Sequence, residues 1–153
     1  MSTITDLQDE VKRHKLFVNW IEIMVGFFKK ESSPRPLFDY RRGQVIWVDF
    51  GFNVGYEFGG DHPAIVLIDT PPNNQKVLVL PLTSKPPKKP FAHHVHVGKL
   101  HGLKPDHWAT VYEIRSVDKL RTRMDAHASP VSGAMLDRIS NTIVQTVALR
   151  TTP

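Results

Sequence analysis

From residue 44 onward, the apolar residues of this chain occur in short runs separated by Pro, Gly and Asn, and this spacing limits the fold more than any other feature. Runs of this length suit β-strands, and the residues at the breaks favour turns. No helical pattern lies between the runs, which argues against a β-α-β unit. The pattern predicts a small, curled, mostly antiparallel barrel. Its strands are expected within residues 44–50, 64–68, 77–82, 91–97 and 108–114.

An amphipathic helix is predicted at the N-terminus, over residues 5–30. Thr5 and Gln8 have the spacing of a capping box. Apolar residues recur there in alternating steps of three and four, with His14 on the same stripe. They are Leu7, Val11, Val18, Ile21, Val25 and Phe28, and Phe17, Trp20, Met24 and Phe27 widen this face. Either the chain's own domain or a second copy in a dimer is expected to cover so much apolar surface. A membrane-surface helix is the alternative, but the polar face is mixed in sign.

A second helix is predicted to close the chain. Ser129 is a plausible N-cap, and the apolar residues that follow it have helical spacing. They are Val131, Met135, Ile139, Ile143, Val144 and Val147. The Ser- and Pro-rich stretch 32–36 stops the first helix. We therefore divide the chain into an N-terminal helix with its linker (residues 1–36) and a sheet domain (residues 37–153), in the α+β class.

The composition excludes several classes of protein. Hydrophobic residues make up 41% of the 153 residues and charged residues 23%, as in an ordinary globular chain. There is no cysteine, so disulfide scaffolds, Cys-ligated zinc and thiol nucleophiles are excluded. The longest apolar stretch, residues 16–28, is shorter than the roughly 20 residues that span a bilayer. With no signal-peptide pattern at the N-terminus, we expect a cytoplasmic protein without a membrane partner.

The positive charge of the chain is concentrated in one segment. Residues 70–105 contain six Lys and no carboxylate, while basic and acidic residues nearly balance elsewhere, so the net charge of +5 arises in this segment. A one-sided positive field attracts a polyanion. A Lys-rich solvated loop is the plainer alternative, and composition alone does not separate the two.

Four blocks of the sequence resemble the MazF/PemK toxin family, in the order and at the spacing of that family. They are residues 42–50 (RGQVIWVDF), 55–67 (GYEFGGDHPAIVL), 79–84 (VLPLTS) and 113–118 (EIRSVD). The resemblance runs over residues 41–150 and leaves the first 40 residues outside. It implies a homodimeric, SH3-like (MazF/CcdB-like) barrel with a C-terminal helix, to which this chain adds the N-terminal helix. It also implies an endoribonuclease that cleaves single-stranded RNA without metal or other cofactor, and a small cognate antitoxin that blocks the RNA groove.

The resemblance and the needs of the reaction together suggest a catalytic set of Glu57, His62 and Thr83. In the family, the 2′-hydroxyl attacks the adjacent phosphate and leaves a 2′,3′-cyclic phosphate and a free 5′-hydroxyl. Such a reaction needs a base, an acid and stabilisation of the phosphoryl oxygens. His62 stands where the family has a catalytic arginine. An imidazole is suited to acid–base work but offers no permanent charge, so Arg41, Arg42 or Arg115 would supply that charge.

Further residues are candidates for binding RNA. Lysines and a serine follow the third predicted strand, aromatic residues occupy the first long loop, and an arginine lies in the fourth block. The candidates are Ser84, Lys85, Lys88, Lys89, Tyr56, Phe58 and Arg115. Phe52 also lies in the loop, and we expect it to be buried. Glu113 stands where the family usually has Gln, and we interpret it as the structural ion-pair partner of Arg115.

The histidines at positions 93, 94 and 96 are potential metal ligands that lie close together in the sequence. On a strand, His94 and His96 would share one face about 7 Å apart, but no third ligand stands nearby in sequence. We therefore predict no metal site. The function we predict is the toxin of a type II toxin–antitoxin pair, acting as an endoribonuclease. A catalytically weakened module that binds RNA or a protein, and a gyrase-targeting toxin on the same fold, are the alternatives.

Overall fold

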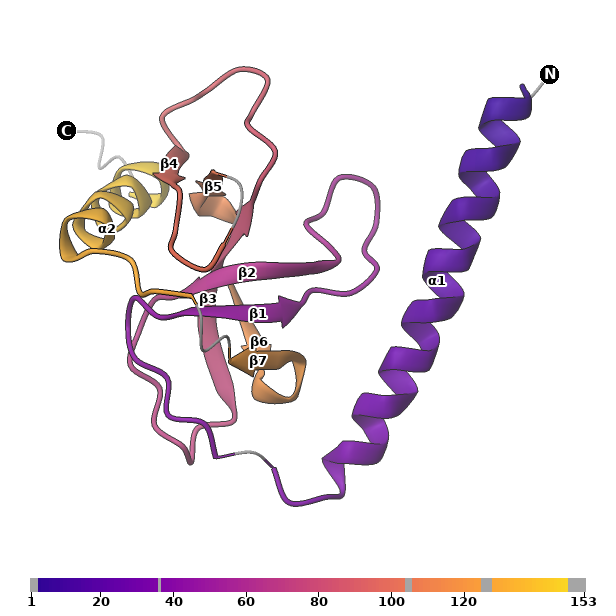
Figure 1. Cartoon of the computed structure of the whole chain (residues 1–153), viewed down its shortest axis with the longest axis horizontal. Coiled ribbons are helices and arrows are strands. Elements are labelled where there is room, and N and C mark those ends of the chain that lie inside the picture. Colours follow the sequence, from indigo (N-terminus) through magenta and orange to yellow (C-terminus); the bar gives the residue numbers. More distant parts are fainter. Residues whose placement is uncertain (1–2, 36, 104–105, 125–127, 149–153) are drawn as a thin grey trace.

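The computed structural model describes residues 3–35, 37–103, 106–124 and 128–148, in which an antiparallel sheet lies between two terminal helices (Figure 1). In chain order the elements are α1 (Ile4–Glu31), β1 (Val45–Asp49), β2 (Asp61–Val66), β3 (Lys76–Thr83), β4 (His94–Gly98), β5 (His107–Thr110), η1 (Val111–Glu113), β6 (Arg115–Asp118), η2 (Lys119–Arg121), β7 (Thr122–Met124) and α2 (Gly133–Val147). The predicted α+β class is therefore confirmed.

The sheet is organised around β3, the longest strand. Its paired neighbours run in the order β4-β5-β3-β2-β1-β7, and β6 also pairs with β3. The first half of β3 pairs with β6 and its last two residues pair with β5, while β2 lies along the other side. The sheet is antiparallel and open, since β4 and β7 are its edges. The five predicted strand regions match β1 to β5, whereas β6 and β7 were not predicted because each is only three or four residues long.

Two apolar cores hold the sheet domain together. One lies beneath α2 and is built on Val45, Ile65, Leu80 and Ile139. The other includes Tyr40, Ile46, Phe50 and Val79, and Phe58 packs against its edge. Strand alternation explains the division, because neighbouring residues of β1 and β3 point to opposite faces of the sheet.

A buried lysine completes the second core. Lys119 is 1% exposed, and its ammonium group donates hydrogen bonds to the carbonyl oxygens of Phe38 (2.7 Å) and Pro71 (2.8 Å). It also lies 5.5 Å from the centroid of the Tyr40 ring. Burial lowers the pKa of Lys119, and the nearby charge of Asp39 opposes that shift.

Both helices form where the sequence indicates, but with different caps. The Thr3 hydroxyl accepts a hydrogen bond from the Asp6 amide (3.2 Å), and the Asp6 carboxylate accepts one from the Thr3 amide (2.8 Å). This capping box replaces the one predicted at Thr5; an acidic residue in the first turn also complements the helix dipole. At α2, Ser132 and not Ser129 is the N-cap, and its hydroxyl accepts from the Met135 amide.

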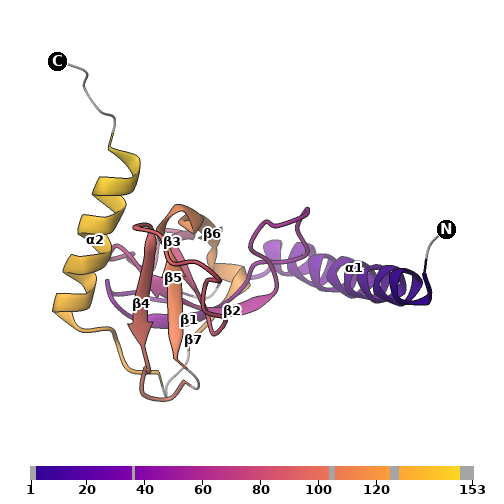
Figure 2. The same ribbon diagram turned by 90° about the horizontal axis from the view of Figure 1, so that it is seen from above.

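Helix α1 projects beside the sheet domain and contacts it along only part of its length (Figures 1 and 2). No residue of α1 is buried. The contact consists mainly of half-buried Trp20, Met24 and Phe27, together with Phe17 against Phe52 at 5.6 Å. The domain therefore covers only the widened part of the predicted apolar face. No helix in the described part of the chain is long and apolar enough to cross a membrane.

Candidate nucleic-acid cleavage site

The adjoining ends of β2 and β3 bring together two of the three predicted catalytic residues. Ala64 pairs with Pro81 in this antiparallel register, so continuing the register by two residues places His62 opposite Thr83. Directly opposite residues of an antiparallel pair lie on one face of the sheet, with Cβ atoms about 4.5–5.5 Å apart. Residues 21 positions apart in the sequence thus share one site.

The imidazole of His62 is half buried and held by its surroundings. Its ring centroid lies 4.6 Å from that of Phe58. Burial lowers the pKa of His62; hydrogen bonding to the backbone of Leu82 and Gly59 and the charge of Asp61 oppose the shift, while Lys85 adds to it. A lowered pKa favours the neutral form of the imidazole, in which one ring nitrogen carries the hydrogen and the other carries a lone pair. The site therefore favours a base over a fixed positive charge at this position.

Thr83 and Lys85 provide a hydroxyl and a positive charge beside this imidazole. The Thr83 hydroxyl oxygen accepts a hydrogen bond from the Lys85 amide (3.1 Å), so its own hydrogen remains able to donate. Lys85 is exposed, as are Ser84, Lys88 and Lys89 on the same loop between β3 and β4. Their charges face solvent, where they can contact a phosphate backbone.

Glu57, the third predicted catalytic residue, lies on the exposed loop between β1 and β2. Its carboxylate accepts a hydrogen bond from the Val54 amide (3.1 Å), so it stabilises its own loop. It also lines a cleft between this loop and α1, to which Trp20 and Asp61 contribute. The interactions that hold His62 do not involve Glu57. The structure therefore groups His62 with Thr83 and leaves Glu57 on a neighbouring segment.

The loop that carries Glu57 is closed by backbone contacts at its base. The Gly60 amide donates to the Gly51 carbonyl (2.8 Å), and the Asn53 side chain donates to the carbonyls of Phe50 (3.1 Å) and Phe58 (2.7 Å). At Gly59, a Cβ atom would lie 2.7 Å from the Gly51 carbonyl oxygen, so this close approach requires glycine. Loop closure in turn holds Phe58 against His62.

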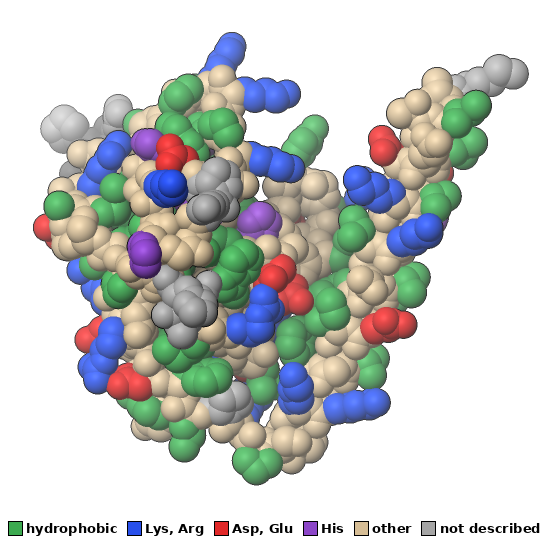
Figure 3. All heavy atoms as spheres, viewed as in Figure 1, with side chains coloured by type: hydrophobic (Ala, Val, Ile, Leu, Met, Phe, Trp, Pro, Cys, Tyr) green, Lys and Arg blue, Asp and Glu red, His purple; other side chains and the backbone are tan. Residues whose placement is uncertain are grey.

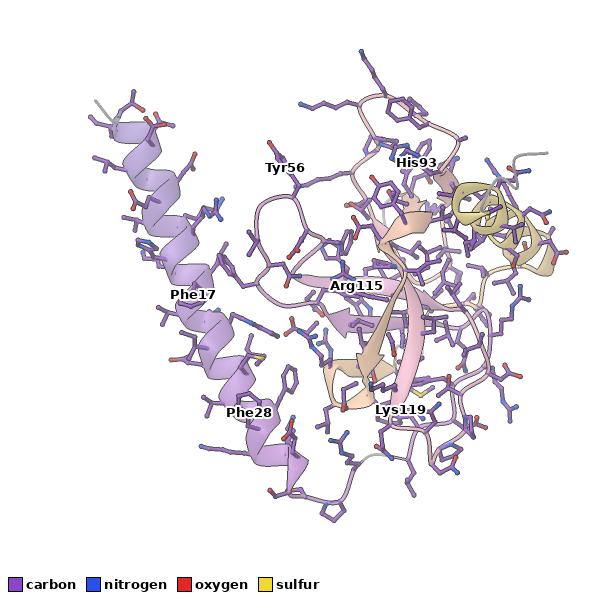
Figure 4. All side chains as sticks on the ribbon, turned by 180° about the vertical axis from the view of Figure 1, so that it is seen from behind. Phe17, Phe28, Tyr56, His93, Arg115 and Lys119 are labelled. Carbon is purple, nitrogen blue, oxygen red and sulfur yellow. The ribbon has the colours of Figure 1, made fainter. Side chains whose placement is uncertain are left out.

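The aromatic residues of this loop take different positions. Tyr56 is fully exposed and points away from the sheet (Figure 4). Phe58 packs instead on Phe50, with ring centroids 5.4 Å apart, so it is part of the wall around His62 and not an open stacking ring as the sequence suggested. Phe52 is only partly buried, and it packs on Phe17 of α1 and not against the sheet, where the sequence predicted its burial.

Arg115 clamps the same loop to β6. Its guanidinium donates to the Phe58 carbonyl (3.1 Å) and to the Glu113 carboxylate (3.0 Å), and it lies 5.4 Å from the centroid of the Phe50 ring. The expected ion pair between Glu113 and Arg115 is therefore confirmed. An arginine with these partners positions the wall of the site.

Two of the three arginines suggested from the sequence lie away from His62. Arg41 pairs with Asp39 (2.8 Å) and Arg42 donates to Ser140 of α2 (2.9 Å), both at the start of β1. His62 pairs with the opposite end of that strand, so neither arginine reaches it. Arg123 of β7 forms a 2.6 Å ion pair with Asp61. The sequence offered no sign of this neighbour, because β7 was not predicted.

His93, just before β4, and His94, the first residue of β4, belong to an aromatic surface cluster. The ring of His93 lies 4.3 Å from that of His94 and 4.8 Å from that of Tyr112, and it stacks on Phe91 at 5.5 Å (Figure 4). His96 instead faces Asp106 (3.3 Å) and Trp108. Among the described residues, no group of three or more potential metal ligands comes together.

The sequence of this chain matches a known protein family, and its fold is similar to solved structures. The sequence profile of the PemK-like, MazF-like toxins of type II toxin–antitoxin systems matches residues 41–147. No curated protein sequence is significantly similar to the chain. Among solved structures, MazF of Deinococcus radiodurans (Form-I) is similar, with a TM-score of 0.59 and 19% identity over 73% of this chain and 99% of that one. An endoribonuclease in complex with its cognate antitoxin from a Mycobacterial species gives a TM-score of 0.53 and 18% identity over 74% and 99% of the chains. The Mycobacterium tuberculosis toxin MazF-mt6 gives 0.51 and 15%, over 75% and 98%.

Proposed function

Because the chain belongs to the PemK-like, MazF-like family of type II toxins, we propose that it is an endoribonuclease that cleaves single-stranded RNA without a metal ion. The observation that carries the proposal is the placement of His62 and Thr83 at adjoining strand ends, beside the exposed Lys85. These three residues offer a base, a hydrogen-bond donor and a positive charge. Cleavage of an RNA phosphodiester by its own 2′-hydroxyl needs these groups.

The proposed reaction begins with proton transfer to His62. The neutral imidazole takes the proton of the 2′-hydroxyl, and that oxygen attacks the adjacent phosphorus. The P–O5′ bond then breaks, leaving a 2′,3′-cyclic phosphate, and the departing 5′-oxygen takes up a proton to become a 5′-hydroxyl. The Thr83 hydroxyl and the Lys85 ammonium stabilise the charge on the non-bridging oxygens. Because the Glu57 carboxylate accepts a hydrogen bond from the Val54 amide on a neighbouring loop, we assign the second proton to solvent water at this site.

The RNA path in this proposal follows the exposed lysines. Lys85, Lys88 and Lys89 lie on the loop after β3, so their charges continue from the reacting phosphate along the strand. Tyr56, with its ring fully in solvent, is available to stack on an unpaired base. Contacts to phosphates contribute affinity and not sequence choice, so the stacking residues would influence which site is cut.

Two protein partners complete the proposal. We propose that the chain forms a homodimer and that a cognate antitoxin blocks its RNA site, acting in the cytoplasm. Support comes from family membership and from similar folds, one of which was solved with its antitoxin.

Purified protein incubated with single-stranded RNA in EDTA tests the reaction. We expect fragments with 5′-hydroxyl and 2′,3′-cyclic phosphate ends, and strong loss of cleavage in His62→Ala and in Thr83→Ala. Cleavage that requires a divalent metal, or undiminished cleavage by both variants, would overturn the assignment.

A second function is favoured by one observation: an imidazole stands where the family uses arginine, and its pKa is lowered, so the site lacks a permanent charge there. A protein that binds RNA or a partner without cutting it fits this feature. Retention of RNA by the wild-type chain with no fragments at either pH 6 or pH 8 would favour this binding module. Growth arrest with intact RNA and damaged DNA would instead indicate a gyrase-targeting toxin.

A further inference from the structure

Helix α1 carries apolar side chains in solvent at several places along its length (Figure 3), and one set of them forms a row along the helix. Its apolar members are 44% to 77% exposed, although each is a residue type that is usually buried. They are Ile4, Leu7, Val11, Val18, Ile21, Val25 and Phe28. A row of this length on one helix marks an interaction surface.

The row has the spacing of a coiled coil. Together with His14, its members alternate in steps of three and four along the whole of α1, which is 28 residues long. A sustained repeat of two apolar positions in every seven is the pattern by which two helices wind around each other. Ile4, Val11, Val18 and Val25 occupy the first of these positions, and Leu7, His14, Ile21 and Phe28 the second.

Apart from His14 and Phe28, which line clefts shared with the sheet domain, the row lies away from the face that contacts that domain. That contact is made by Trp20, Met24 and Phe27, which lie about a third of a turn around the helix axis from the row, at roughly 100° per residue. Trp20 lies against Gly51 and 5.1 Å from the Arg121 guanidinium. The helix can therefore keep its contact with its own domain while the row binds a partner.

We propose that α1 pairs with α1 of a second copy of this chain as a parallel, two-stranded coiled coil. β-branched residues fill all four of the first positions, and Leu7 provides a leucine at one of the second positions; in parallel pairs this combination favours two strands. The flanking charges agree, because Glu10 of one helix would face Lys15 of the other, twice per dimer. The proposal concerns a surface that the ribonuclease site does not use and does not depend on cleavage activity.

The absence of native cysteine makes a direct test possible in the full-length protein. In the parallel pair, Leu7→Cys would meet its own counterpart, within the Cα separation of about 4.4–6.8 Å that a disulfide spans. Leu16→Cys is the control matched in exposure, since Leu16 is also 52% exposed; it lies on the opposite side of the helix from the row, where it lines the cleft between α1 and the loop before β2. Under mild oxidation at low protein concentration, we expect Leu7→Cys to form a disulfide dimer at least about tenfold faster than Leu16→Cys, because pairing raises the effective thiol concentration.

Further variants test whether the two helices are parallel and whether the partner is a second copy of this chain. Adding Val18→Lys and Ile21→Lys to Leu7→Cys should abolish the rapid crosslink, whereas adding Lys12→Ala and Lys30→Ala, away from the row, should preserve it. Circular dichroism would confirm that α1 remains helical.

Equal rates for Leu7→Cys and Leu16→Cys would overturn the proposal and would indicate that the row binds a different protein. A crosslink that forms only between Leu7→Cys and Val25→Cys chains would show an antiparallel pair and overturn the parallel one. Association between sheet domains would tether both thiols in the same way, so the ratio of the Leu7→Cys rate to the Leu16→Cys rate reports pairing of the helices, and it does not depend on RNA cleavage.

Discussion

The imidazole of His62 lies against the ring of Phe58, with the ring centroids 4.6 Å apart. Phe58 is held there by two hydrogen bonds to its carbonyl, from Asn53 and Arg115. One hydrophobic ring thus connects the loop that carries Glu57 to the residue that we propose as the base. Because Phe58 buries the imidazole, we expect it to affect the pH dependence both of cleavage and of the free energy of unfolding.

The pH dependence of cleavage should follow the protonation of His62. Burial lowers its pKa below the ordinary value of 6.5, so the imidazole stays neutral as the pH falls to about 6.5 and loses activity only at lower pH. Phe58→Ala lets water reach the ring, so the pKa of His62 should rise and the acid limb of the rate profile should move to higher pH. NMR titration of the imidazole and the pH–rate profile measure the two quantities. His94→Gln is the control that should leave the limb in place; an unshifted limb in Phe58→Ala would contradict the role of His62.

The lowered pKa of His62 also makes the free energy of unfolding depend on pH. Because the folded pKa of His62 is lowered, the unfolded chain takes up the proton first as the pH falls. The free energy of unfolding should therefore decrease from about pH 6.5 downward, through the folded-state pKa. Urea unfolding at several pH values should show a smaller decrease in His62→Gln than in the wild type. Parallel curves would show that this imidazole does not contribute.

Thr83→Ala should lower the rate of cleavage by about 10²-fold, the usual cost of removing one donor to a developing oxyanion. Thr83→Ser is the matched control, because it retains the hydroxyl that accepts from the Lys85 amide. Single-turnover kinetics with saturating protein would measure the chemical step. If serine and alanine variants are equally slow, the packing of the β-branched side chain, and not the hydroxyl, is what the site needs.

Arg115→Gln should destabilise the loop and the fold together. The guanidinium is 30% exposed and holds both the Phe58 carbonyl and the Glu113 carboxylate, so its loss should cost about 1–3 kcal/mol. Arg123→Gln is the control: that side chain is 57% exposed in its pair with Asp61, and such pairs contribute about 0–1 kcal/mol. Denaturant unfolding compares the two variants. A larger loss in Arg123→Gln than in Arg115→Gln would be inconsistent with the clamp.

Gly51→Ala should loosen the contact between α1 and the sheet domain. Gly51 has a φ of +83°, and a Cβ atom there would lie 2.5 Å from the Trp20 ring. Gly55→Ala shares the unfavourable positive φ but meets open space, so it separates backbone strain from the clash. Limited proteolysis in the linker after α1 should become faster in Gly51→Ala than in Gly55→Ala. Equal rates would mean that the Trp20 contact does not hold the helix.

The local elements of this protein were readable from its sequence, since they depend on neighbouring residues. Hydrophobic spacing located both helices and five strand regions, because periodicity reports which side of an element is buried. It did not identify β6 and β7, which are too short for a pattern and exist through pairing with β3 and β1. Competing caps such as Thr3 and Thr5 were also too alike in sequence to separate.

The amino-acid sequence by itself determined the family, the concentration of positive charge and the types of residue available for catalysis. Only the tertiary structure decided which of these residues meet: the register of β2 on β3 brings His62 to Thr83, while Arg41 and Arg42 lie at the far end of β1. It likewise turned Phe58 inward and left the apolar row of α1 in solvent. Strand register and helix docking join residues far apart in the chain, and contacts of that kind are set by packing of the whole fold, which no local pattern records.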